Sequence, residues 1–352
     1  MPAPFIESGN ASRSDRAQCR ALIRRGSRSF YAAAVLLPPR IRIPAFALYG
    51  FCREADDAVD ETAAATTLEQ LQERLHRIYC GCPRPGAVDR AFADAVAQHS
   101  IPRALPDALL EGFAWDLAGR RYGDLDALTD YAARVAGTVG AMMACIMGVR
   151  DPAAVARASE LGIAMQLTNI ARDVGTDARA GRLYIPLQWL REAGIDPEVW
   201  LARPAFNRAV GSVVGRLLEA ADGLYERATA GIRLLPRDCR CGIRAARLIY
   251  AEIGASLRRQ GLDSVSRRAV VPLRRKLALI ARSLSAEVDG GWEQLQPHAS
   301  ARFLVAAVLG QPASHAVPRV SAWDARMQWL HGLYERLEQR DRGFLRQPRA
   351  GA

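Results

Sequence analysis

The chain has 352 residues, half of them hydrophobic, and its 48 basic and 37 acidic residues give a formal net charge of +11. This composition suits a large buried core and acidic partners such as diphosphates or anionic membrane surfaces. Nucleic acid is disfavoured because no Lys/Arg-rich block occurs, and no apolar run reaches the ~18 residues of a membrane span. With no apolar region in its N-terminal MPAPFIESGNASRSDR, the chain is expected to be cytoplasmic.

Apolar residues recur with the helical period of 3.6 along most of the chain, and alternating strand patterns are scarce. The pattern predicts an all-α domain over residues 15–289, after a tail (1–14) and before a partly helical extension (290–352) whose last dozen residues are disordered. Helices are predicted at 15–35, 43–62, 67–80, 88–99, 105–121, 126–147, 152–174, 187–193, 207–232, 241–261 and 272–288. A last amphipathic helix is predicted around Met327, Leu330, Tyr334 and Leu337.

The first acidic run, ADDAVDE, lies in the helix predicted at 43–62. At about 100° per residue, Asp56 and Asp60 fall beside the apolar stripe, with Tyr49 and Arg53 on the same side, while Asp57 falls further round. Arg53 could bind a phosphate oxygen or orient a carboxylate. An exposed acidic helix end would show the same residues, so this run alone does not decide for a site.

The second run follows over a hundred residues later. Gln166, Asn169, Asp173 and Asp177 form one polar stripe between apolar residues, and Arg172 is expected to point elsewhere. Gly175, near the expected end of the helix, could free backbone groups for a ligand. Two carboxylate pairs on separate helices suit Mg²⁺, a hard ion that takes oxygen ligands and often bridges carboxylates to substrate phosphates. The sequence therefore predicts a metal-dependent enzyme that acts on a phosphorylated substrate.

Four stretches resemble bacterial members of the squalene/phytoene synthase family. They are Gly26-SRSFYAAAVLLPP, Tyr49-GFCREADDAVDE, Tyr131-AARVAGTVGAMM and Met165-QLTNIARDVGTDARAGRLYIP. The resemblance covers roughly residues 15–285 and implies a single α-helical isoprenoid-synthase domain around a deep central cavity.

The resemblance also implies roles for residues that match the family's motifs. Asp56, Asp60, Asp173 and Asp177 would hold two or three Mg²⁺ or Mn²⁺ ions, assisted by Asn169. Arg53, Gln166, Asn169, Arg268 and Lys276 would act at the diphosphates. Ser27 and Phe30 would belong to a flap, and Tyr49, Tyr131, Tyr184 and Tyr250 would line the site.

The implied reaction joins two molecules of geranylgeranyl diphosphate head to head. An allylic cation forms when diphosphate leaves, a cyclopropyl-carbinyl diphosphate follows, and a second ionisation with proton loss gives the C40 hydrocarbon phytoene. No NADPH is expected, because no reduction is required and no G-x-G-x-x-G fingerprint follows a predicted strand.

Three alternatives stay open. A sister enzyme that makes squalene or dehydrosqualene from farnesyl diphosphate would share every metal ligand. A chain-elongating prenyl synthase would usually show DDxxD in both motifs, and a non-enzymatic assembly factor of the same fold should have lost its aspartates. The expected partners are the prenyl diphosphate, the inner membrane surface as a peripheral site of product release, and a downstream desaturase.

Overall fold

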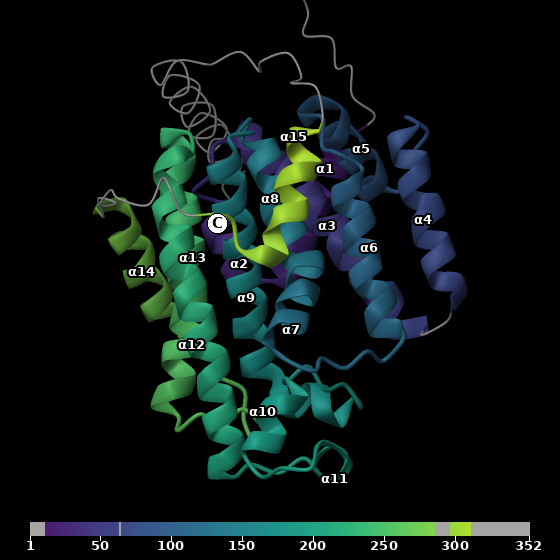
Figure 1. Ribbon diagram of the computed structural model, residues 1–352. Helices are drawn as coiled ribbons and strands as arrows, with labels where there is room; N and C mark the ends of the chain where they lie inside the picture. The colour runs from purple at the N-terminus through teal and green to yellow at the C-terminus, as the bar shows by residue number, and fades with distance from the viewer. Residues whose placement is uncertain (1–10, 63–64, 286–295, 311–352) are drawn as a thin grey trace, which may run out of the picture. The chain divides into compact units, whose positions relative to one another are not determined.

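The computed structural model describes residues 11–62, 65–285 and 296–310 (Figure 1). Of these residues 77% are helical and none lies in a strand, which confirms the predicted all-α class. They belong to one compact unit, Met1–Ser314. The domain boundaries expected after residues 14 and 289 both fall within this unit and remain predictions. The helix expected around Met327 and the Arg-rich tail lie outside the described residues.

The first part of the unit contains the first acidic run, which lies in the C-terminal turns of one helix, α3 (Pro39–Thr62). Its elements are α1 (Arg13–Gly26), α2 (Arg28–Ala34), α3, α4 (Ala65–Tyr79), α5 (Ala87–His99), α6 (Ala104–Leu117), α7 (Leu125–Ala132), the π-helical segment η1 (Ala133–Gly137) and α8 (Thr138–Ile146).

The second part contains the second acidic run, in α9 (Pro152–Arg179), and ends with α15 (Arg302–Leu309), which packs into the core. Its elements are α9, α10 (Leu187–Glu192), α11 (Pro197–Ala202), α12 (Arg208–Gly231), the 3₁₀ turn η2 (Ile232–Leu234), α13 (Arg237–Arg259), α14 (Leu273–Ser285), the 3₁₀ turn η3 (Ala299–Ala301) and α15.

The helix predicted over 15–35 is interrupted at Ser27. Ser27 has an extended backbone (φ −147°, ψ 99°), and its hydroxyl accepts the N–H of Phe30 at 3.2 Å. A serine that caps a helix competes with continuation of the preceding one. The break therefore starts a separate short helix, α2, which carries Phe30.

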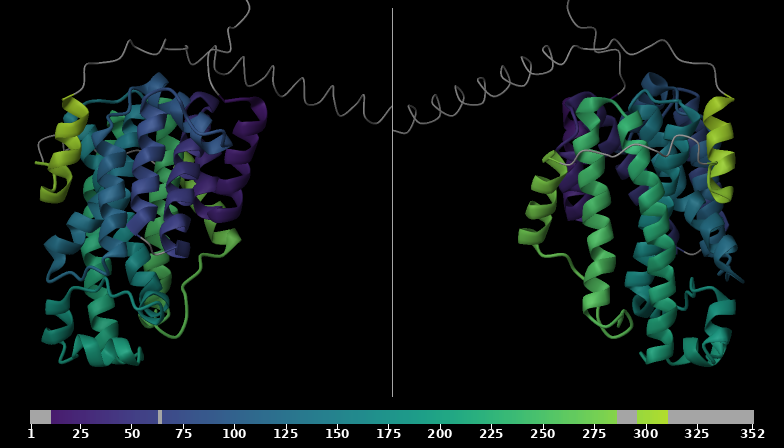
Figure 2. Two further views of the ribbon diagram at one scale, coloured as in Figure 1. Left: turned by 90° about the vertical axis from the view of Figure 1, so that its right-hand side faces the viewer. Right: turned by 60° about the vertical axis from the view of Figure 1, so that its left-hand side comes forward.

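Helix α9 is the central element, and it runs five residues beyond its predicted end at 174. It packs against α12, α13, α8 and η1, and α12 and α13 lie side by side in Figure 2. Glycines allow the closest approach: a Cβ at Gly162 would lie 2.2 Å from the carbonyl oxygen of Ala136, and one at Gly140 would lie 2.1 Å from that of Ala158. The V-A-G-T-V-G stretch thus seats η1 and α8 directly on α9.

The extension contributes to the core as far as residue 310. Arg157 and Arg227 both donate to the carbonyl of Gln296, and Glu160, which is fully buried, accepts the N–H of His298 at 2.9 Å. Helix α15 follows and buries Leu304. No helix was predicted from the sequence at these residues, because the apolar run of α15 is short and lies in a Pro/Gly/Ser-containing stretch.

Candidate active site

A cavity of about 640 Å³ runs along α9. Two of its lining residues, Arg157 and Arg172, lie fifteen residues apart on that helix, or about 22 Å at 1.5 Å per residue. The lining near Arg157 is mainly small and apolar, and Arg157 itself is paired with Glu160 at 3.0 Å. Polar lining residues gather on the last turns of α3 and α6, on the C-terminal half of α9, and after α13: Arg53, Asp56, Asp116, Gln166, Asn169, Arg172, Arg268 and Lys276.

The first acidic run ends α3. Asp56 lines the cavity, and burial together with the nearby Asp60 raises the pKa of Asp56 to about 6. Asp60 is exposed and accepts a hydrogen bond from Arg182 at 2.7 Å. Arg53 lines the cavity but lies closer to Asp57, to which it donates at 3.0 Å, than to Asp56 at 3.7 Å. Of these two neighbouring aspartates, Asp56 lines the cavity and Asp57 does not. Asp56 is also the one that the helical wheel places beside the apolar stripe.

The second run lies within α9, where Asp173 accepts hydrogen bonds from two arginines. Arg172 donates at 2.9 Å and Arg268 at 2.6 Å. Burial would raise the pKa of Asp173, but these hydrogen bonds hold it below its ordinary value. The expectation that Arg172 points elsewhere is wrong, because its long side chain folds back onto the neighbouring carboxylate.

Asp177 lies one turn further along α9. No ion pair to it occurs in the described part of the chain, and burial together with the charge of Asp173 raises the pKa of Asp177 to about 7.

Gly175, between Asp173 and Asp177, does not free backbone groups for a ligand. Its N–H donates to the carbonyl of Ser264 at 3.0 Å, and a Cβ there would lie 2.2 Å from the carbonyl oxygen of Val265.

The amide residues of the stripe also face the cavity. Asn169 donates to the Oε1 of Gln166 at 3.5 Å, and the Oδ1 of Asn169 is buried without a hydrogen-bond partner. Within the described ranges, no three His, Cys, Asp or Glu side chains are close enough together to hold an ion by themselves. This donor set suits Mg²⁺, which is usually bound by one or two carboxylates and completed by water and substrate phosphates.

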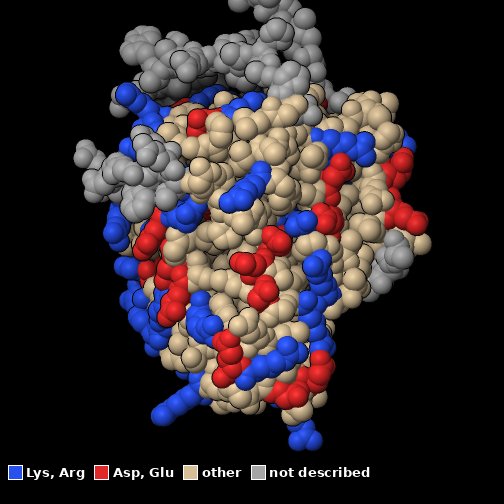
Figure 3. All heavy atoms as spheres, viewed as in Figure 1, with Lys and Arg blue, Asp and Glu red and all other residues tan. Residues whose placement is uncertain are grey.

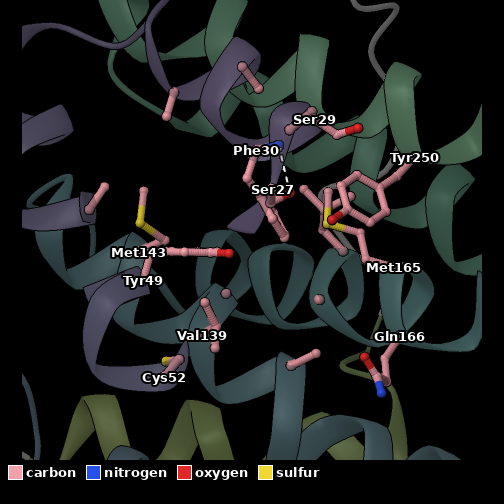
Figure 4. A pocket seen from close by; sticks show the side chains of 18 of the residues that line it. Ser27, Ser29, Phe30, Tyr49, Cys52, Val139, Met143, Met165, Gln166 and Tyr250 are labelled. Atoms are coloured by element: carbon pink, nitrogen blue, oxygen red, sulfur yellow. Dashed lines mark hydrogen bonds between the residues drawn. The ribbon is translucent and has the colours of Figure 1, made fainter. Parts of the chain in front are cut away.

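Aromatic side chains form much of the wall. The rings of Phe30 and Tyr250 lie 4.9 Å apart, and those of Phe30 and Tyr49 lie 6.3 Å apart. Figure 4 shows Tyr49 and Met143 on one side of the cavity, with Tyr250 and Met165 on the other. Burial raises the pKa of Tyr49 and Tyr250, so both hydroxyls keep their protons at neutral pH.

Asp116 is a site residue that the sequence reasoning missed. Its two carboxylate oxygens accept hydrogen bonds from the hydroxyls of Tyr131 and Tyr184, each at 2.8 Å. Asp116 and Tyr131 line the cavity, whereas Tyr184 stacks behind Tyr131 and does not line it. A lone carboxylate in the otherwise apolar stretch GFAWDL was the available signal, because burying it is costly without partners.

The remaining expected residues come together in the same cavity. Ser27 and Phe30 of α2 line it, as do Arg268 from the loop after α13 and Lys276 from α14. Burial and the charge of Arg28 lower the pKa of Lys276. Of the four aspartates, only Asp56 belongs to the lining, while Asp173 is connected to it through Arg172 and Arg268.

Residues 23–275 match the squalene/phytoene synthase family. A phytoene synthase of Rhodobacter capsulatus is 52% identical over 82% of this chain and 86% of its own length, and one of Cereibacter sphaeroides is 47% identical over 94% and 95%. Among solved structures, a dehydrosqualene synthase in complex with a ligand superposes with a TM-score of 0.69 at 29% identity, covering 77% of this chain and 96% of its own. A squalene synthase from Alicyclobacillus acidocaldarius superposes with a TM-score of 0.64 at 26% identity, covering 70% and 94%.

Proposed function

The chain belongs to the squalene/phytoene synthase family, and on that premise we propose that it acts as a phytoene synthase. This prenyltransferase would condense two molecules of geranylgeranyl diphosphate head to head, through a cyclopropyl-carbinyl diphosphate, to phytoene. The observation that carries the proposal is the cavity. It joins a largely apolar channel along α9 to an end with acids, amides and cations, as a long prenyl chain with a diphosphate head requires.

Several side chains are placed to bind the diphosphates. Arg268 and Lys276 line the cavity, and Arg268 is paired with Asp173 at 2.6 Å. Arg53 lines it beside Asp56. Arginine can bind phosphate oxygens bidentately, and lysine adds a compact positive charge. Positive charge placed where the leaving diphosphate gains negative charge stabilises the transition state of ionisation.

The family consists of divalent-metal-dependent prenyl diphosphate enzymes. Asp56, Asp60, Asp173 and Asp177 would hold Mg²⁺ or Mn²⁺, and the Oδ1 of Asn169, buried without a partner, is a further oxygen donor. When bound, the ion supplies Lewis-acid charge for the leaving diphosphate.

The walls would protect the cation that ionisation leaves behind. Tyr49, Tyr131, Tyr250 and Phe30 line the cavity with aromatic faces, and burial raises the pKa values of the three tyrosines so that they stay neutral. An aromatic face attracts a nearby cation by ~0.5–2 kcal/mol. The apolar side chains around them exclude the water that would otherwise quench it.

Two alternatives are less supported. A squalene or dehydrosqualene synthase would use farnesyl diphosphate in the same fold, but the relatives at 47–52% identity are named phytoene synthases. An assembly factor without activity would not need four aspartates and an amide row beside one cavity.

The product would be a hydrocarbon without a polar group, so we infer release at a membrane surface, with a desaturase as a downstream partner. None of the described helices is both long and apolar enough to cross a bilayer. The proposed location is the cytoplasm, with peripheral binding to the inner membrane.

The test is incubation of the purified protein with C15 or C20 diphosphate, followed by mass analysis of the hydrocarbon. Phytoene should form from the C20 substrate with Mg²⁺ or Mn²⁺ alone and disappear with a chelator. A hydrocarbon that appears only with NADPH, or only from the C15 substrate, would move the assignment to squalene or dehydrosqualene synthase. No product under any condition would favour the assembly factor.

A further inference from the structure

Helix α14 (Leu273–Ser285) leaves large apolar side chains uncovered. Leu273, Leu277 and Leu284 are 72%, 58% and 69% exposed, and Val270, just before the helix, is 67% exposed. The opposite side of α14 packs on α13, where Leu279 and Ser283 are buried. These four exposed residues are here called the α14 apolar face. Three of them lie on α14 itself, which carries more large exposed hydrophobic side chains than any other described helix.

The helix has three distinct faces. At about 100° per residue, the three leucines fall within about 40° of one another. Arg274, Arg282 and Arg275 follow at about 100° to 200° from Leu273, and the side buried on α13 lies beyond them. Of these three arginines, Arg274 borders the leucine stripe, whereas Arg275 is paired with Glu252 at 2.9 Å. A helix with an apolar stripe bordered by a basic residue is typical of segments that lie in the interface of a lipid bilayer.

We propose that the α14 apolar face docks this protein onto an anionic lipid bilayer. The leucines would enter the boundary between headgroups and acyl chains, and Arg274, exposed at the edge of the leucine stripe, would meet the anionic headgroups. Figure 3 shows Lys and Arg along the left edge, where Figure 1 places α14. The charge around the leucines is what identifies the occupant.

A second copy of the chain fits this surface less well. Two α14 faces pressed together would bring the Arg274 side chains of both copies close to one another, and like charges at a shared interface are unfavourable. An anionic bilayer presents the opposite charge together with an apolar layer, so it complements both features of the helix.

Docking would set the membrane beside the proposed reaction. Lys276 of α14 lines the cavity, and so does Arg268 from the loop that leads into this helix. The benefit for release of an apolar product rests on the proposed function. The docking itself does not, because it requires neither substrate nor turnover.

The experiment is co-sedimentation of the full-length protein with neutral phosphatidylcholine vesicles and with vesicles containing phosphatidylglycerol, at low and high salt. The variant L273Q/L284Q removes two exposed leucines, and V199Q/L309Q is its matched control on α11 and α15, where the side chains are 71% and 52% exposed. R274Q tests the charge beside the leucines, with R208Q as the control at an exposed arginine elsewhere.

We expect L273Q/L284Q to bind anionic vesicles at least about tenfold more weakly than wild type, since each leucine loses an apolar contact. R274Q should lose about fivefold at low salt and much less at high salt, at about 1 kcal/mol for one basic residue. Both controls should bind like wild type. Turnover measured in detergent micelles reports on the proposed function separately.

Two results would overturn the proposal. One is wild-type binding that is absent or equal for neutral and anionic vesicles. The other is normal vesicle binding by L273Q/L284Q; if that variant also changes in molar mass by light scattering, protein covers this face.

Discussion

Arg182 donates a hydrogen bond to Asp60 at 2.7 Å although the two residues lie 122 positions apart. This contact joins the loop after α9 to the end of α3, so the two acidic runs are held together without a ligand. Asp173 is likewise held by Arg172 and Arg268. One carboxylate of each pair therefore has close arginine partners, whereas Asp56 and Asp177 keep raised pKa values of about 6 and 7.

Those pKa values predict how pH affects metal binding. Mg²⁺ needs ionised carboxylates, so its affinity should fall as pH falls through 7 and 6. Because both pKa values are raised above those of the unfolded chain, stability from these groups is present at low pH and is lost as pH rises through 6 and 7. Bound Mg²⁺ would offset that loss. We expect Mg²⁺ to raise the melting temperature by about 2 °C or more at pH 8 and by less at pH 5.5, measured by differential scanning fluorimetry.

A charge-neutral variant provides the control. Asp177→Asn should reduce the shift caused by Mg²⁺ at pH 8 and should stabilise the metal-free protein there, while Asp130→Asn, on the exposed side of α7, should change neither. An equal Mg²⁺ shift at both pH values would contradict the assignment of these carboxylates as ligands.

Asp56 and Asp57 should differ strongly in their effect on turnover. Asp56 lines the cavity, whereas Asp57 holds Arg53. Asp56→Asn keeps the size of the side chain but removes a ligand charge, and we expect kcat to fall by about 10²- to 10³-fold, as for other groups that act on transition-state charge. Asp57→Asn should cost less than about tenfold, because only the orientation of Arg53 changes. Asp173→Asn should resemble Asp56→Asn. The rate of product formation from the C20 diphosphate measures kcat, and circular dichroism checks that each variant is folded. Equal losses of kcat in Asp56→Asn and Asp57→Asn would show that the helical wheel selected the wrong face.

The class of the fold could be predicted from the sequence because it depends on local periodicity, whereas most of the expected site residues followed from the family resemblance. The four-residue spacing of Asp56 and Asp60 fixes their common side of α3 whatever packs against it. The features that the sequence could not predict depend on the conformations of long side chains and on contacts between distant residues. Arg172 folds onto Asp173, and Arg182 reaches Asp60, through rotamers that no spacing rule determines. The break at Ser27 was also missed, because the apolar pattern continues through it while the serine caps α2.

Asp116 should position Tyr131. Its carboxylate accepts both tyrosine hydroxyls at 2.8 Å, and Asp116→Asn would replace one accepting oxygen by an amide that donates. We expect a stability loss of about 1–3 kcal/mol from the unsatisfied hydroxyl and a fall in kcat that exceeds the change in KM. Tyr184→Phe is the comparison, since Tyr184 shares the carboxylate but does not line the cavity. If Tyr184→Phe lowers kcat as much as Tyr131→Phe, Asp116 acts through the whole cluster rather than through Tyr131.

Gly175 should be required for placing Arg268. A Cβ at Gly175 would lie 2.2 Å from the oxygen and 2.6 Å from the Cα of Val265, which are backbone atoms of the loop that carries Arg268. Gly175→Ala must therefore move that loop, and we expect a loss of about 1–3 kcal/mol in unfolding free energy, as for overpacked sites. KM for the diphosphate should rise because Arg268 leaves its position beside Asp173. Gly223→Ala is the matched control, because nothing lies within 4 Å of a Cβ at that helical position. That variant should be stabilised by about 0.5–1 kcal/mol through helix propensity and should keep its KM. A Gly175→Ala protein with normal KM and normal stability would mean that the loop can move without affecting Arg268.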